Sequence, residues 1–166
     1  MEMKTMKMTG FKYNFFSDRK GAKYEWECGR TTYKGNAGEF YEASVKYVHG
    51  YKPIKDASTP YDEGSDIEEE NTSVKSWDFT LASKCKADSF EKVLTQFFRN
   101  VHSSRFIFGW VDIDANEVVE INMNTSEFKE FLNRYARYDA NRKIVRGCGF
   151  SQKKRMDVLT WAEKNC

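Results

Sequence analysis

The spacing of apolar and polar residues predicts helices alternating with short strands along the 166-residue chain. The clearest helix is amphipathic, with apolar residues at intervals of three and four that give it one buried face: Phe90, Val93, Leu94, Phe97, Phe98 and Val101. Another helix is expected where residues 124–126 offer a cap and the inward positions are Phe128, Phe131, Leu132 and Tyr135. A last helix is expected to start at Ser151.

Pairs of polar residues mark where two of the helices begin. Asn36 and Glu39 are spaced as a capping box, which predicts a first helix over about residues 36–49. Asp88 and Glu91 have the same spacing ahead of the amphipathic helix. Both helices are therefore expected to have defined starts.

Stretches rich in aromatic and β-branched residues predict the strands. Residues 105–111 form one, a turn follows at residues 114–116, and residues 118–123 form the next. A further strand is expected near residues 143–148. Helices interleaved with strands indicate an α/β (α+β) fold, as a single domain with a mixed central sheet flanked by helices.

The N-terminal segment, residues 1–34, mixes basic and aromatic residues. Aromatic faces between cations suit stacking on single-stranded or distorted nucleic acid. A strand whose aromatics face the core is the simpler interpretation. We expect this segment to form an arm or strands ahead of a single α/β domain over residues 35–166.

The net charge of +2 is small, but the charge is unevenly distributed. Residues 56–70 contain seven acids and no Lys or Arg, whereas ten bases and four acids from Lys129 onward give that part +6. Acids can hold divalent cations and bases can hold phosphates, so this distribution is typical of a metal-dependent nuclease. Solvated faces on either side of a core explain it as well.

Acids and a lysine come together in a hairpin predicted for residues 64–76. An even-numbered loop within residues 69–72 gives a register that pairs Asp66 with Lys75, Ile67 with Val74 and Glu68 with Ser73. Because side chains alternate along a strand, one face then carries Asp66, Glu68, Ser73 and Lys75. Directly opposed Cβ atoms lie about 4.5–5.5 Å apart, close enough for two carboxylates to hold a divalent cation beside an ammonium group.

The order of these residues resembles the active site of the PD-(D/E)xK nuclease superfamily, which combines a metal-binding carboxylate, a second carboxylate and a lysine. By this resemblance Asp66 matches the first acid and Lys75 matches the lysine. Ser73 stands where the second acid should be, and the predicted register offers Glu68 as its replacement. Glu39 sits where the superfamily often carries a helical glutamate. The resemblance covers about residues 36–112. The surrounding amino-acid sequence is also similar to that of small proteins of phages and bacterial mobile elements.

The resemblance implies a restriction-endonuclease-like core that cleaves DNA with Mg²⁺ or Mn²⁺. The implied catalytic residues are Asp66, Glu68, Lys75 and Ser73, and the implied metal ligands are Asp66, Glu68, the Val74 carbonyl and Glu39. The metal would lower the pKa of a bound water and neutralise the phosphate, while Lys75 would orient the nucleophile or offset developing charge. The capping box gives Glu39 a structural explanation too.

The basic C-terminal third is expected to bind nucleic acid, DNA rather than RNA, through its phosphates. The candidate residues are Arg134, Arg137, Arg142, Lys143, Arg146, Lys153, Lys154 and Arg155. The last three fall in the first turn of the predicted last helix, where positive charges oppose the helix dipole and anions are favoured. A phosphate would neutralise them.

Cysteine usage and hydropathy bear on the compartment. Cys28, Cys85, Cys148 and Cys166 form no CxxC pair and have no His at zinc-ligand spacing, so we expect reduced thiols and no structural zinc. No apolar run approaches the roughly 18 residues that a membrane span requires. We therefore expect a cytoplasmic protein of a bacterial cell, without membrane association.

Three functions remain open from the sequence. The first is a metal-dependent nuclease, for which a homodimer is an option because many members of the superfamily dimerise to cut both strands. The second is a catalytically inactive nuclease-fold protein that inhibits a host CRISPR or restriction nuclease, with the acidic run imitating phosphates. The third is an accessory protein of replication or conjugation that grips DNA with its basic third.

Overall fold

The central feature is a four-stranded mixed sheet in the order β1-β8-β7-β5. The computed structural model describes residues 1–55, 66–82, 88–147 and 152–166. The strands of the central sheet are β1 (Glu2–Lys7), β5 (Thr72–Ser76), β7 (Arg105–Asp112) and β8 (Glu117–Asn124). β5 runs parallel to β7, and the other neighbours are antiparallel.

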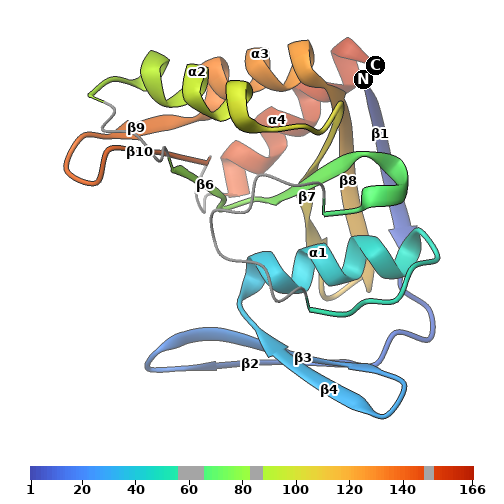
Figure 1. Ribbon diagram of the computed structural model, residues 1–166. Helices are drawn as coiled ribbons and strands as arrows, with labels where there is room; N and C mark the ends of the chain where they lie inside the picture. The colour runs from blue at the N-terminus through green and yellow to red at the C-terminus, as the bar shows by residue number, and fades with distance from the viewer. Residues whose placement is uncertain (56–65, 83–87, 148–151) are drawn as a thin grey trace.

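Two smaller antiparallel sheets complete the strand layout (Figure 1). One is formed by β2 (Tyr13–Asp18), β3 (Gly21–Cys28) and β4 (Thr31–Gly35). The other has the order β6-β10-β9 and consists of β6 (Thr80–Ala82), β9 (Arg137–Asp139) and β10 (Ile144–Arg146). The mixed α/β class expected from the sequence is confirmed, and so is the mixed sheet flanked by helices.

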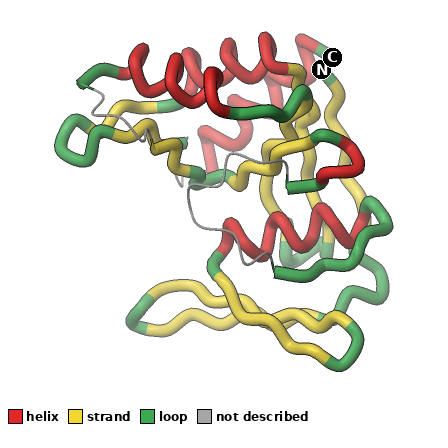
Figure 2. Tube along the Cα trace, viewed as in Figure 1, coloured by secondary structure: helices red, strands yellow, loops and turns green. Residues whose placement is uncertain are grey.

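Helices cover both faces of the central sheet (Figures 1 and 2). One face packs against α2 (Phe90–Asn100), α3 (Thr125–Tyr135) and α4 (Gln152–Asn165), around a core rich in aromatic rings. The other face packs against α1 (Ala37–Val48), which lies between the central sheet and the β2-β3-β4 sheet. A sheet covered on both faces explains why β7 and β8 are buried along nearly their whole length, including the polar residues Glu120 and Asn122 of β8.

The helix caps follow the sequence with one correction. Asn36 and Glu39 form the predicted capping box, and Asn124 caps α3 with Glu127 in the same way. The start of α2 was predicted at Asp88, which is wrong by one residue. Ser89 accepts the Lys92 N–H there, whereas the Asp88 carboxylate forms an ion pair with the Lys92 ammonium at 2.8 Å.

The N-terminal segment is built into the fold. β1 pairs along its length with β8, and the Met1 amino group lies 2.7 Å from the Glu127 carboxylate. Aromatic side chains of β2 and β3 pack on α1, where the Tyr24 ring stacks on Phe40 at 4.4 Å. Phe15 and Phe16 are the exceptions, with 46% and 40% of their surface exposed. The core-facing interpretation therefore holds for most of these aromatics.

Candidate functional site

The hairpin that carries Asp66 closes in a register different from the predicted one. Ile67 pairs with Thr72, and the turn between them contains the 3-10 helix Glu68–Glu70. Asn71 closes the turn in the left-handed conformation, with φ at 49°. The predicted pairings of Asp66 with Lys75, Ile67 with Val74 and Glu68 with Ser73 are therefore wrong, because Glu68 belongs to the turn and not to a strand. Gly64 and Ser65, the predicted start of the hairpin, lie outside the described residues.

The alternation of faces along β5 is as predicted. Val74 lies beside Ile107 and belongs with Ile67 to the core under α1. Ser73 and Lys75 lie beside Phe106 and Phe108, so they face α2 and α3 on the other side of the sheet. The Lys75 ammonium stands 5.8 Å from the centre of the Phe97 ring of α2.

Asp66 lies at the free edge of β5. Its carboxylate accepts the Val74 backbone N–H at 2.6 Å, in the place where a further hairpin bond would form. Because β5 is the last strand of the sheet, this N–H points away from β7. Asp66 thus sits where side chains from both faces of the sheet can approach it.

From the α1 side, the Glu42 carboxyl group hydrogen-bonds with Asp66. Lys46, one turn further along α1, is buried and forms an ion pair with Glu42 at 3.6 Å. Its ammonium also donates to the Ile54 carbonyl at 3.4 Å. Sequence reasoning missed Glu42 as a site residue, because its partner Asp66 comes from a separate segment.

Burial dominates the titration of Asp66 and raises the pKa of its carboxyl group. The positive charge of Lys75, the Val74 N–H, the Glu42 hydrogen bond and the charge of Lys46 act in the opposite direction and lower that pKa. Lys75 is thus an electrostatic neighbour of Asp66 although it belongs to the opposite face of the sheet. The arrangement joins two carboxyl groups and two ammonium groups.

The remaining predicted residues of this site lie elsewhere. Glu68 is exposed in the turn. Ser73 is buried and shares a hydrogen bond of 2.7 Å with the hydroxyl of Ser103. Glu39 caps α1 and forms an ion pair with Lys55 at 2.9 Å. Val74 contacts Asp66 through its N–H, and a metal-binding role for its carbonyl stays a prediction.

Four of the predicted nucleic-acid-binding residues lie on one hairpin formed by β9 and β10. These four, which we call the basic hairpin, are Arg137, Arg142, Lys143 and Arg146, and all are exposed. Arg137 and Arg146 are paired directly across the two strands. Like charges placed opposite each other destabilise a strand pair, which makes this a place where a bound anion would be favourable. Arg134 is in the last turn of α3, and Lys153, Lys154 and Arg155 are in the first turn of α4.

A second group of ionisable side chains was not expected from the sequence. His49, the C-cap of α1, has its Nε2 atom 2.8 Å from the Glu120 carboxylate and its Nδ1 atom 3.1 Å from that of Glu70. Glu120 is fully buried on β8. The hydrogen bond to Glu120 raises the pKa of His49, burial opposes this, and the charges of both glutamates add to the rise. An acid within the apolar stretch of residues 118–123 was the signal that a buried partner was needed.

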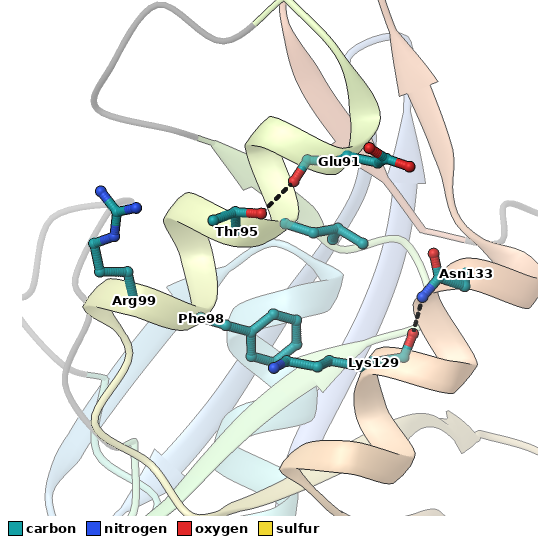
Figure 3. A pocket seen from close by; sticks show the side chains of 7 residues that line it. Glu91, Thr95, Phe98, Arg99, Lys129 and Asn133 are labelled. Carbon is teal, nitrogen blue, oxygen red and sulfur yellow. Dashed lines mark hydrogen bonds between the residues drawn. The ribbon is translucent and has the colours of Figure 1, made fainter.

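A surface groove of about 580 Å³ runs between α2 and α3 (Figure 3). Its apolar lining is Leu94 and Phe98, and the polar lining is Glu91, Thr95, Arg99, Lys129 and Asn133. The Lys129 ammonium lies 4.9 Å from the centre of the Phe98 ring, which it partly covers. The groove contains none of the residues of the predicted catalytic site.

Cys28 and Cys166 are free thiols, while Cys85 and Cys148 lie outside the described residues. Within the described ranges, no three side chains of His, Cys, Asp or Glu are grouped closely enough to hold a metal ion. Among the described residues, Asp66 and Glu42 would therefore be the carboxylate ligands of a cation bound at this position.

Comparisons with known proteins give no match to a family model, a curated protein or a solved structure. Among the helices described, none has the length and apolar character needed to cross a membrane.

Proposed function

We propose that the protein hydrolyses phosphodiester bonds of DNA with a divalent cation held by Asp66 and Glu42. The observation that carries the proposal is the hydrogen-bonded pair of carboxyl groups at the free edge of β5, within the electrostatic reach of Lys75. Two carboxyl groups in contact share a proton or a cation, because two adjacent negative charges repel strongly when they are partly buried. The pair is therefore suited to exchange its proton for a metal ion.

The donor set fits Mg²⁺ or Mn²⁺. Both ions prefer oxygen ligands, and Mg²⁺ is commonly held by one or two carboxylates while waters and substrate phosphates complete its coordination. When bound, the ion would supply a water of lowered pKa and neutralise the phosphate. In this proposal Glu42, and not Glu68 as predicted from the hairpin register, takes the role of second acid.

The protein side chains orient and stabilise the reacting groups. The Val74 N–H fixes the Asp66 carboxylate at 2.6 Å, and Lys46 holds Glu42 through its ion pair. Lys75 would place positive charge where negative charge develops on the phosphate, which is an effective form of catalysis in a site with restricted water. The basic hairpin would hold neighbouring phosphates of the DNA.

The test is a cleavage assay on supercoiled, linear and single-stranded DNA with Mg²⁺ or Mn²⁺ and with chelator. We expect metal-dependent cleavage that Lys75→Ala removes while circular dichroism still shows a folded protein, because the Lys75 side chain is only partly buried. If no preparation cleaves DNA while the folded protein binds it, the alternative of an inactive nuclease-fold binding protein is favoured instead.

A further inference from the structure

Arg155 and two tryptophans form a cluster separate from the carboxyl pair. The guanidinium carbon of Arg155 lies 5.5 Å from the ring centre of Trp77 and 5.4 Å from that of Trp110. The two indoles meet edge to face, with ring centres 5.3 Å apart. The pairing of β5 with β7 places them together, because Trp77 directly follows Ser76, whose partner is Gly109.

Two donors of this cluster have no acceptor. The Nε1 atom of Trp77 and the Nε atom of Arg155 are buried and have no hydrogen-bond partner among the described residues. Trp77 itself is only 4% exposed. Both groups are donors that cannot accept, so they cannot satisfy each other. Leaving such groups unpaired is unfavourable, which is why few occur in folded proteins.

The charge of Arg155 is not neutralised by an ion pair within the described part of the chain. Burial lowers the pKa of Arg155, whereas Tyr24 and Asp112 raise it through their charges. Asp112 is engaged in its own turn, where its carboxylate accepts the Ala115 N–H at 3.1 Å. Asp112 therefore acts on the half-buried guanidinium through its charge without forming an ion pair with it among the described residues.

The position of Arg155 in α4 also favours an anion near its side chain. It is the fourth residue of a 14-residue helix, so its side chain leaves the first turn, where unpaired backbone N–H groups and the helix dipole favour anions. Lys153 precedes it in the same turn. The two unpaired donors and the charge of Arg155 therefore coincide at the beginning of a helix.

We infer that the Trp77–Arg155–Trp110 cluster is a binding site for a phosphate oxyanion, presented either as free phosphate or as a phosphodiester of single-stranded DNA. An oxygen of such a group would accept from Trp77 Nε1 and Arg155 Nε, and its charge would neutralise the guanidinium. The inference concerns binding alone and does not depend on DNA cleavage.

The test follows tryptophan fluorescence of the full chain during titration with inorganic phosphate, and in a second arm with a short single-stranded oligonucleotide, at constant ionic strength. We expect a saturable change in emission in the wild type. Arg155→Gln should remove it. Arg155→Lys, which keeps the charge but loses the planar donor group, and Trp77→Phe, which keeps an aromatic ring but loses the N–H, should each weaken binding about tenfold or more.

The matched control is Arg105→Gln in the phosphate arm. Arg105 is an exposed arginine at the start of β7 and is not one of the candidate nucleic-acid-binding residues, so its removal should leave the phosphate response intact. A response to the oligonucleotide alone that still requires Arg155 would assign the site to phosphodiesters. Responses in both arms that are equal in wild type, Arg155→Gln and Arg155→Lys would overturn the inference and make the cluster a packing contact. Lack of a response in the wild type to either probe would overturn it too.

Discussion

The carboxyl groups of Asp66 and Glu42 are hydrogen-bonded to each other at the free edge of β5, although one residue precedes that strand and the other belongs to α1. The Val74 N–H fixes one of them, and Lys46 forms an ion pair with the other. Acids brought together in this way raise the free energy of the folded protein unless a proton or a cation separates them.

Asp66→Asn should stabilise the metal-free protein at neutral pH, by about 0.5–2 kcal/mol if it behaves as stabilising substitutions at functional sites commonly do. The amide can still accept the Val74 N–H but carries no charge. Since the folded-state pKa of Asp66 is raised, the wild-type penalty is absent below the ordinary carboxyl pKa, grows as pH rises from that value, and is complete once pH exceeds the folded-state pKa. Denaturant titrations with chelator at neutral and acidic pH measure this. Glu68→Gln, an exposed acid of the same turn, is the control, and equal effects of both substitutions would contradict the account.

Glu42→Gln and Glu68→Gln should separate the two candidates for the second acid. We expect Glu42→Gln to lower the rate of metal-dependent DNA cleavage strongly, because a charged ligand is lost from a site for a hard cation. Glu68→Gln should cleave at the wild-type rate, because Glu68 lies in the 3-10 turn. Single-turnover cleavage rates at saturating Mg²⁺ decide. The opposite pattern would restore the assignment to Glu68.

His49→Gln should destabilise the fold by about 3 kcal/mol, because it leaves the buried Glu120 carboxylate without its cationic partner. The pKa of His49 is raised in the folded state. The stability that this rise contributes is therefore fully present below the ordinary histidine value and is lost as pH rises through the folded value.

The measurement is unfolding free energy across the pH range from about 5.5 to 8.5, which spans the ordinary pKa of histidine. The difference between wild type and His49→Gln should shrink toward the alkaline end. His102→Gln is the matched control, since His102 is the second of the two histidines in the chain and is exposed. A loss for His49→Gln that is constant with pH would mean that His49 acts as a neutral hydrogen-bonding group.

The double variant Arg137→Gln/Arg146→Gln should weaken DNA binding across unrelated sequences. Each phosphate contact contributes about 0.9 to the slope of log affinity against log salt for duplex DNA, so the slope should flatten by about two. Fold stability should not fall, because the variant removes two like charges that face each other across β9 and β10.

Gel-shift titrations at several salt concentrations give the slopes for this double variant. Lys7→Gln/Lys92→Gln makes the same change in charge at lysines that already form ion pairs, with Glu117 at 3.1 Å and Asp88 at 2.8 Å. It should leave the slope unchanged. If both double variants flatten the slope equally, net charge rather than the basic hairpin governs binding.

Local signals in the sequence predicted much of the fold. The capping box at Asn36 and the cap expected within residues 124–126 marked two helix starts correctly, because caps are set by residues a few positions apart. The cap of α2 was misplaced by one residue because Asp88 and Ser89 are both good caps, and Asp88 is instead used in an ion pair. The burial of Val74 and Ile67 on one face followed from strand alternation alone.

The candidate site could not be predicted in the same way, because its residues come together from separate parts of the chain. The register of the hairpin was set by the left-handed Asn71, which allows a 3-10 turn and removes Glu68 from the strand. Glu42 meets Asp66 only because α1 packs against β5. His49 and Glu120 are 71 residues apart, so the sequence could indicate that Glu120 needed a partner without showing which one.

The most direct test of the proposed site is the binding of Mn²⁺, followed by electron paramagnetic resonance of the free ion, to wild type, Asp66→Asn, Glu42→Gln and Glu68→Gln. We predict saturable Mn²⁺ binding by wild type and Glu68→Gln. Binding should be lost in Asp66→Asn and Glu42→Gln, because the hydrogen-bonded carboxyl groups of these two residues are the metal ligands of the proposed site. Wild-type affinity in Asp66→Asn, or no Mn²⁺ binding by the folded wild-type protein, would contradict the account.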